Sequence, residues 1–356
     1  GAMAYALADY GGRLWALSDG GVVGLSVAAI VIVTAANALG LVVGKTAQNV
    51  LTVAKVVGLG GVVAAGFLAT GASTPVAEQQ PSGAGSLGLA MVFVLYAYGG
   101  WNDAAFVAAE VRDRRRDIPR ALFGGLAVVT LIYLAVNVAY LRVLGYAGAQ
   151  AASTPAADVL QQAVGPMGAK LVSVLVMISA LGAINGLILT GSRVYASLGA
   201  DHRVFSWLGH WNQRRGAPII ALIAQGAIAV LLVSAVGTTA GRAAIDGTLN
   251  ALWLSGLPWD EYFGGFETLV AGTAPVFWGF FFLSGTTLFI LRYRDPDRPR
   301  PFSTPFFPLP PLVFCAMCGY MLYASLTYAK GLAIIGLLPL AIGIPLYFFS
   351  RRSEPG

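Results

Sequence analysis

The chain has 356 residues and a formal net charge of +6; 57% of its residues are hydrophobic and only 11% are charged. Soluble domains carry about 25% charged residues, so this chain has too few charges to cover a soluble surface of its size. The composition excludes a soluble globular enzyme, a disordered chain and a disulfide scaffold. It also disfavours a nucleic-acid binder, because the arginines fall in short loops between apolar runs.

Long runs without charge predict membrane-spanning α-helices. A bilayer core about 30 Å thick needs about 20 apolar residues, and these runs lack the alternation of β-barrel strands. In chain order the nine runs are 20–44, 56–77, 79–109 (interrupted only by Asp103), 121–141, 171–192, 216–241, 268–291, 301–329 and 331–350. In the run 301–329, we expect the span to begin after Pro310 and Pro311, because proline suits a helix start.

The loops between these runs differ in basic residues. One set of segments, near residues 45, 112–120, 193–215, 292–300 and 351–352, holds 16 of the 22 lysines and arginines. The positive-inside rule places this set and the C-terminus in the cytoplasm. Nine spans then put the N-terminus outside. We therefore expect residues 1–10 to end a further span and the chain to be the C-terminal part of a longer protein.

The segment 95–102, LYAYGGWN, interrupts an apolar run with a pair of glycines. Each glycine costs a helix about 1 kcal/mol relative to alanine, and broken backbone inside a membrane occurs only where it is buried in protein or lines a cavity. Half-helix ends of this kind bind the charged groups of small zwitterions in transporters. Asn102 and Asp103 suit the start of a second half-helix. The alternative is that Gly99 and Gly100 only allow close helix packing.

The residues after the glycine pair resemble a known family. The run YAYGGWNDAAFVAAEVRDRRRDIPRAL from Tyr96, followed by a span with Tyr133 and Asn137, is similar to the sixth and seventh helices of the amino acid–polyamine–organocation superfamily, and most of all to its L-type amino acid transporter branch. Matches to the other helices cover essentially the whole chain: Asn37, Gly40, Gln48, Thr52, Lys55, Gly182, Asn185, Gly186, Arg193, Ala217-Pro218, Leu291-Arg292 and Arg300-Pro301.

The resemblance implies an all-α integral membrane protein with the LeuT-like inverted-repeat fold, in which two repeats of five helices precede two accessory helices. The chain is then a single transmembrane domain, 1–356, with about nine helices, lacking the first two to three. Residues 20–72 correspond to the last two helices of the first repeat, 86–292 to the second repeat and 305–350 to the accessory helices. In this family the absent broken first helix binds the substrate carboxylate.

The resemblance also implies a substrate site. The aromatic side chain of Tyr96 closes over the substrate as a gate, and the carbonyls of Tyr96 and Gly99 accept hydrogen bonds from its ammonium group. Ala183 and Leu187 replace small polar residues of some relatives and so favour neutral amino acids. The substrate-binding residues are therefore expected to be Tyr96, Gly99, Gly100, Trp101, Asn102, Ala183 and Leu187.

Two charged residues are further candidates. Lys55 follows Lys45 by ten residues, or about 15 Å of helix, which places it near mid-membrane at a cost of about 2.5–3.5 kcal/mol. In proton-coupled relatives the matching lysine replaces a sodium ion, so the resemblance implies proton coupling. The alternative is a snorkelling lysine at the inner interface, with 56–77 as the span. Glu110 precedes an arginine cluster and is either an inner-gate residue or part of a surface ion pair.

Other motifs favour structural roles. Gly182 and Gly186 form a GxxxG typical of helix packing. Cys315 and Cys318 lie in an apolar run without partner ligands, and His202 and His210 make a poor metal site. We therefore expect no metal, cofactor or catalytic residue. The segment 196–213 is either an interfacial helix or a loop.

The sequence therefore predicts secondary active transport of neutral amino acids by alternating access, through proton symport or amino acid exchange, in a prokaryotic cytoplasmic membrane. A disulfide-linked heavy subunit is not expected, because residues 10–20 contain no cysteine. The alternatives are a polyamine or amino acid/amine antiporter, a membrane receptor and a membrane-embedded enzyme. The antiporter would need acidic pocket residues, and the enzyme would need convergent catalytic groups within the spans.

Overall fold

A computed structural model describes residues 1–69, 94, 97–106, 108, 111–152, 154–257, 259, 264–298, 300 and 303–350. Within these residues the chain is helical apart from loops and one isolated β-bridge between Asn212 and Ala217. Seven segments are long and apolar enough to cross a membrane, and the last, 309–350, contains two helices. The chain is therefore an all-α, multi-pass integral membrane protein.

The helices occur along the chain in the order of the predicted spans. The elements that the structure describes are α1 (Ala2–Trp15), α2 (Asp19–Ala38), α3 (Leu41–Leu68), α5 (Asp103–Phe106), α6 (Arg114–Ala151), α7 (Pro155–Val164), α8 (Met167–Asp201), η2 (Arg203–Gly209), α9 (Ile219–Gly237), α10 (Thr239–Ala251), α11 (Gly264–Arg294), α12 (Leu309–Ala329), η4 (Lys330–Ala333) and α13 (Ile334–Ser350). The helix α12 begins at Leu309, so Pro310 and Pro311 lie in its first turn and not before it, as a proline-bearing helix start allows.

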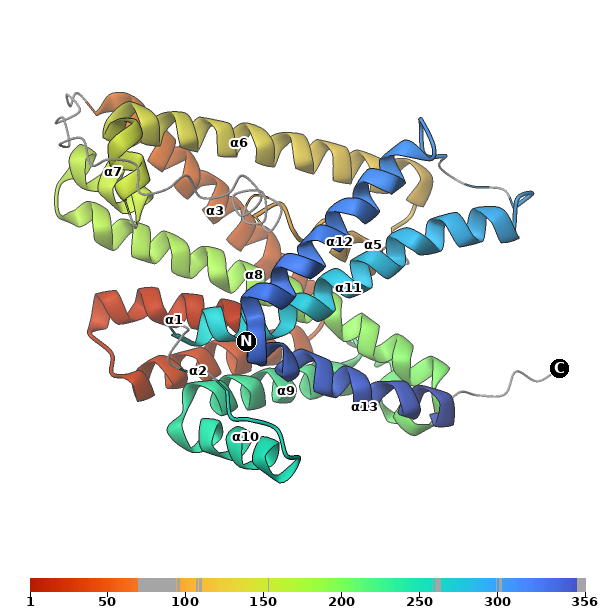
Figure 1. The fold of residues 1–356 in the computed structure, drawn as a ribbon. Helices are drawn as coiled ribbons and strands as arrows, with labels where there is room; N and C mark the ends of the chain where they lie inside the picture. Colours follow the sequence, from red (N-terminus) through yellow and green to blue (C-terminus); the bar gives the residue numbers. More distant parts are fainter. Residues whose placement is uncertain are drawn as a thin grey trace.

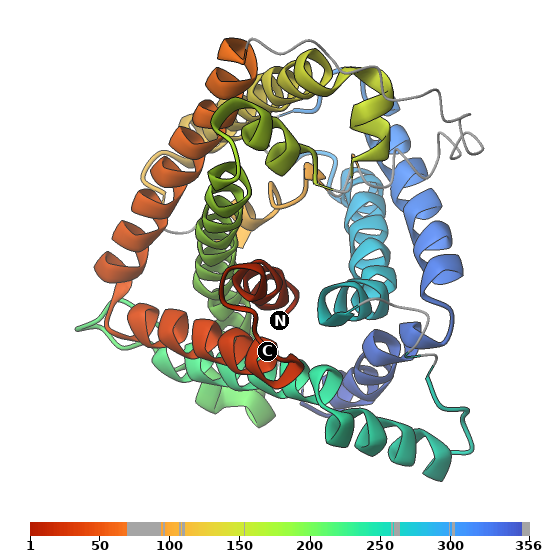
Figure 2. The same ribbon diagram turned by 90° about the vertical axis from the view of Figure 1, so that its left-hand side faces the viewer.

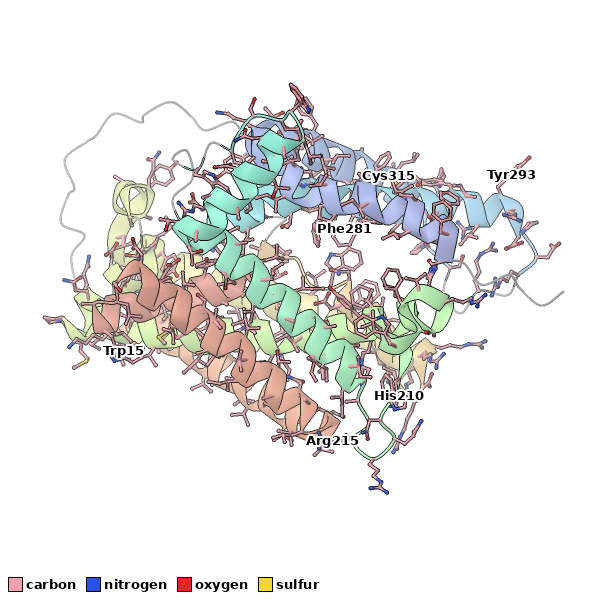
Figure 3. The ribbon with its side chains drawn as sticks, turned by 90° about the horizontal axis from the view of Figure 1, so that it is seen from below. Trp15, His210, Arg215, Phe281, Tyr293 and Cys315 are labelled. Atoms are coloured by element: carbon pink, nitrogen blue, oxygen red, sulfur yellow. The ribbon has the colours of Figure 1, made fainter. Side chains whose placement is uncertain are left out.

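The basic ends of the long helices gather on one side. In Figure 1 the start of α6 and the ends of α8, α11 and α13 lie toward the right of the view, whereas α7 lies toward the left. Figure 3, which keeps this left-to-right direction, places His210, Arg215 and Tyr293 toward the right and Trp15 at the left. The segments rich in arginine therefore share one end of the helical array, as the positive-inside pattern requires.

Several predicted boundaries were wrong. The run 20–44 is not one helix: α2 ends at Ala38 and α3 begins at Leu41. Gly40 separates them with a φ of +144°, and Arg215 donates a hydrogen bond to the carbonyl of Ala38 at 2.9 Å. The helix α3 starts at Leu41, well before the predicted run 56–77, and Lys55 lies in its middle.

Polar segments also form more helix than their composition indicated. The first helix continues past residue 10 to Trp15, and the amphipathic helices α7 and α10 were not predicted. In the segment 196–213, α8 continues to Asp201 and the 3-10 helix η2 follows, so most of the segment is helical and the interpretation as a plain loop is wrong. His202 there contacts Ser350 at the end of α13, with 2.8 Å between Nδ1 and Oγ.

The buried core lies around α1, which Figure 2 shows near the middle of the helices, between α2, α8 and α11. The Tyr5 hydroxyl donates to the carbonyl of Val233 at 2.6 Å and anchors α1 to α9. Gly182 and Gly186 face α3, where an added Cβ would lie 3.3 Å from Leu51 and 3.5 Å from Gln48. The GxxxG is therefore confirmed as a packing motif that brings α3 and α8 together.

Candidate functional site

The glycine pair interrupts the helix, as predicted. The amide of Tyr98 still bonds to the carbonyl of Val94 in the α-helical pattern, but residues 98–102 form turns and Gly100 has a φ of +95°. Beyond the turn, the amide of Asp103 bonds to the carbonyl of Gly100, three residues back, and α5 begins at Asp103. The interpretation of the glycines as a packing pair is wrong for Gly100, since a Cβ on this residue would meet no atom within 4 Å.

Tyr133 of α6 supports the backbone just before the break. Its hydroxyl donates to the carbonyl of Ala97 at 3.0 Å, and its ring meets that of Tyr98 edge-on with 5.2 Å between centroids. The Ala97 carbonyl lies where the regular helical bonding stops, so it requires a donor from outside the helix. Tyr133 provides that donor and fixes the first half-helix to α6.

The broken segment opens onto a large cavity of about 1230 Å³. Its walls come from α3, α6, α8, α11, α12 and the turn after Tyr98. The cavity brings together seven of the residues expected from the sequence: Lys55, Gly99, Gly100, Trp101, Asn102, Ala183 and Leu187. Residues far apart in the sequence thus meet around one cavity that is partly open to the outside.

The α8 side of the cavity is apolar and closely packed against α3. Gly182, Ala183, Gly186 and Leu187 line it, and the small glycines allow α3 to bring Gln48 and Lys55 into the same wall. Lys55 is half-buried and makes no ion pair or hydrogen bond with any residue that the structure describes. A lysine in the middle of a membrane helix that faces an internal cavity marks a functional position more often than a structural one.

The opposite wall is aromatic. Trp101 stacks on Phe281 of α11, with 5.7 Å between ring centroids and 13° between the planes, and it meets Phe314 of α12 edge-on. Phe277 and Trp278 extend this cluster along α11. Figure 3 labels Phe281 and Cys315 on these neighbouring helices, α11 and α12. The aromatic rings give the cavity a large apolar surface next to the polar backbone of the break.

Few polar groups enter the cavity. Asn102 donates from Nδ2 to Asp103 Oδ1 at 3.0 Å, and its buried Oδ1 has no described hydrogen-bond partner. Arg114 and Arg115 lie at the end where α6 begins. Within the described ranges, no group of His, Cys, Asp or Glu side chains is arranged to hold a metal ion. Such a site suits non-covalent binding of a small molecule with both polar and apolar parts.

Two predicted residues lie outside the described part of the chain, namely Tyr96 and Glu110. Conversely, the sequence reasoning missed the aromatic wall and the contact between Tyr133 and Ala97. The unusual run of Phe and Trp at 277–282 was a visible signal, but an apolar helix does not reveal which of its faces meets a cavity.

The chain was compared with known proteins. A model of the amino acid permease family matches residues 1–349. The mouse (Mus musculus) b(0,+)-type amino acid transporter 1 is 29% identical over 296 residues, which cover 80% of this chain and 53% of that protein. The serine/threonine exchanger SteT of Bacillus subtilis is 27% identical over 364 residues, covering 98% of this chain and 75% of the exchanger.

The human (Homo sapiens) large neutral amino acids transporter small subunit 2 is 27% identical over 264 residues, covering 74% of this chain and 44% of that protein. The chain spans about half the length of the mammalian relatives that it matches. The family match nevertheless extends over nearly the whole chain and includes the broken segment and both walls of the cavity. The chain therefore belongs to the amino acid permease family.

Proposed function

We propose that this chain transports neutral amino acids across a membrane by alternating access. The supporting observation is the cavity itself, where a broken membrane helix, a lysine without a described partner and two apolar walls meet. The exposed carbonyls of a half-helix end attract an ammonium group, and an apolar wall accepts an uncharged side chain. The names of the relatives, amino acid transporters and a serine/threonine exchanger, support the same function.

The residue roles within this proposal follow the positions around the cavity. The carbonyls of Tyr96 and Gly99 are proposed to accept hydrogen bonds from the substrate ammonium, Gly100 provides the turn at the break, and Asn102 lines the pocket beyond it. Ala183 and Leu187 form the α8 wall for the substrate side chain, and Trp101 belongs to the aromatic wall. Tyr96 and Glu110 are proposed as gates, and Lys55 as the proton-coupling residue. Either proton symport or amino acid exchange is compatible with these roles, and the exchanger among the relatives favours exchange.

A polyamine or amino acid/amine antiporter is less well supported. Among the described residues that line the cavity, Asp103 is acidic, whereas Lys55, Arg114 and Arg115 are basic. A polycation would meet a net positive wall, which costs binding energy. The cavity also contains no described arrangement of catalytic groups that would support an embedded enzyme.

The orientation and surroundings are part of the proposal. The arginine-rich end of the helices faces the cytoplasm of a prokaryotic cell, so the C-terminus lies inside. The repeat boundaries at 20–72, 86–292 and 305–350 follow from the same assignment. Because residues 10–20 contain no cysteine, we do not expect a heavy subunit to be linked to this chain by a disulfide.

Uptake of a panel of radiolabelled amino acids into proteoliposomes that contain the full-length protein tests the function. We expect saturable uptake of neutral amino acids and little uptake of putrescine or arginine. Preloading with unlabelled amino acid should accelerate uptake if the protein is an exchanger. Saturable binding without any uptake would instead indicate a receptor and would contradict the proposal.

A further inference from the structure

A chain of three side-chain amides joins α2, α8 and α3 beside the cavity. Asn37 and Asn185 are 2% and 1% exposed. Asn37 Nδ2 donates to the carbonyl of Val33 at 2.9 Å and to Asn185 Oδ1 at 2.7 Å. Asn185 Nδ2 donates to the carbonyl of Gly44 at 3.1 Å and to Gln48 Oε1 at 2.9 Å. The three hydrogen-bonded amides therefore connect the buried end of α2, through Asn185 of α8, to Gln48 of α3.

The hydrogen bonds fix the orientation of each amide in this row of three side chains. A side-chain amide has two N–H donors and one carbonyl acceptor. The carbonyl of Asn185 is used by Asn37, so its nitrogen must face α3, and Gln48 must offer its own oxygen in return. A reversed Gln48 would place two N–H groups face to face. Asn37 and Asn185 thus determine which side of the Gln48 amide carries the nitrogen, and they leave both hydrogens of Nε2 unused by the amide–amide bonds.

The amide of Gln48, which is the last of the three hydrogen-bonded amides, lies in the cavity wall. Gln48 is half-buried and lines the cavity, and no described residue accepts a hydrogen bond from its Nε2 group. A Cβ on Gly186 would lie 3.5 Å from this nitrogen, so Gln48 is level with Ala183 and Leu187 on α8. The α8 side of the cavity is otherwise apolar, and the two N–H groups of Gln48 therefore place a pair of hydrogen-bond donors with a fixed orientation there.

We propose that Gln48 selects substrates that carry an oxygen on the side chain, and that Asn185 and Asn37 are positioning residues for it. This inference rests on the proposed function and narrows its substrate class to neutral amino acids with a side-chain hydroxyl or amide. A donor in a confined wall loses its solvation when an apolar substrate binds without an acceptor. Threonine is thereby preferred over valine, which has nearly the same shape.

The test compares the uptake of labelled threonine and valine by the full-length protein in proteoliposomes. Gln48→Met keeps the length of the side chain but removes both donors, and we expect the threonine-to-valine ratio of kcat/KM to fall about 3- to 10-fold. Asn185→Leu removes the group that orients Gln48 and should lower the ratio in the same direction. Gln225→Met is the matched control, because Gln225 donates to the carbonyl of Leu187 from α9 and does not line the cavity.

The threonine-to-valine ratio of kcat/KM distinguishes an effect on substrate recognition from an effect on folding. A purely structural role would lower the uptake of both amino acids together and leave the ratio unchanged in Gln48→Met, which would overturn the inference while transport continues. An unchanged ratio in Asn185→Leu alone would overturn the positioning role. Thermal stabilisation of the purified protein by each amino acid gives the same ratio for a variant that folds but does not transport, and Gln48→Leu replaces Gln48→Met if the latter does not fold. If the unchanged protein neither binds nor takes up either amino acid, the proposed function fails first.

Discussion

The hydroxyl of Tyr133 and the main-chain carbonyl of Ala97 lie 3.0 Å apart although 36 positions separate them in the sequence. Ala97 is the last helical residue before the turn at 98–102. A carbonyl at that place has lost its regular partner and, inside a membrane, must find another donor or remain unpaired at a cost of several kcal/mol. Tyr133 therefore makes the interruption of the helix compatible with the membrane interior.

Replacing Tyr133 by Phe removes this donor and preserves the ring contact with Tyr98. We expect a loss of about 1–3 kcal/mol in stability, because the carbonyl of Ala97 is left without its donor, together with a higher KM for uptake. Thermal unfolding and uptake kinetics measure the two effects. Tyr146→Phe, which lies just beyond the kink at Gly145 near the end of α6 and is 78% exposed, is the control. Equal KM and melting temperature in both variants would show that the contact does not support the site.

A substitution at Gly100 tests the effect of backbone conformation separately from the effect of side-chain clashes. An added Cβ would meet no atom within 4 Å, but the φ of +95° is one that side chains with a Cβ rarely adopt. Gly100→Ala is therefore expected to cost about 1–2 kcal/mol and to reduce uptake strongly. Gly124→Ala on α6 also places its Cβ in open space, but in a helical conformation, and should be neutral or stabilising by up to about 1 kcal/mol. Similar uptake by the two variants would contradict the role of the left-handed turn.

The break could be predicted because its signal is local. Two adjacent glycines in an apolar run, followed by Asn102 and Asp103, contain the information that the helix stops and restarts there. The long apolar spans were predictable for the same reason, since the bilayer sets their length. The boundary between α2 and α3 was not, because hydropathy is continuous from 20 to 44. Only the conformation of Gly40 and the hydrogen bond from Arg215 to the carbonyl of Ala38 mark the division.

The composition of the cavity could be predicted only in part. Ala183 and Leu187 were expected from the resemblance, and they line it. Phe281 and Phe314 were not, because α11 and α12 are apolar on all sides and nothing in their sequence distinguishes a lipid-facing ring from a cavity-facing one. The position of Gln48 likewise depends on Asn185, which is far away in the sequence and meets it only through helix packing.

Trp101 connects the broken segment to α11 and α12. Its stacking on Phe281 and edge contact with Phe314 predict that Trp101→Ala weakens both the binding of substrate and the docking of the turn. Aromatic pairs contribute about 0.5–1.5 kcal/mol each beyond their buried area. Uptake kinetics and thermal unfolding should both be affected, whereas Trp253→Ala, at a residue that is 97% exposed, should change neither. An intact KM for Trp101→Ala would place the indole outside the binding site.

Gly44 tests the packing that holds the amide chain together. A Cβ on Gly44 would lie 2.2 Å from Asn37 Oδ1, and the Asn37 side chain is fixed by its two hydrogen bonds and cannot move aside. Gly44→Ala is expected to destabilise the protein by about 1–3 kcal/mol, typical of overpacking. Gly61→Ala on the same helix, with no atom within 4 Å of its Cβ, is the matched control. A melting temperature for Gly44→Ala equal to that of the control would show that α2 and α3 can separate without cost.

Lys55 provides a titratable charge that faces the cavity from the middle of α3. If its proton is exchanged during transport, the rate of uptake depends on pH through this group, and Lys55→Ala removes that dependence. Lys45→Ala, in the first turns of the same helix at an exposed position, should leave the pH profile unchanged. Asp103, Arg114 and Arg115 also line the cavity, so Asp103→Asn is measured in parallel to separate the carboxyl group from the lysine. An identical pH profile for the unchanged protein and Lys55→Ala would exclude a coupling role and leave the lysine with a purely electrostatic one.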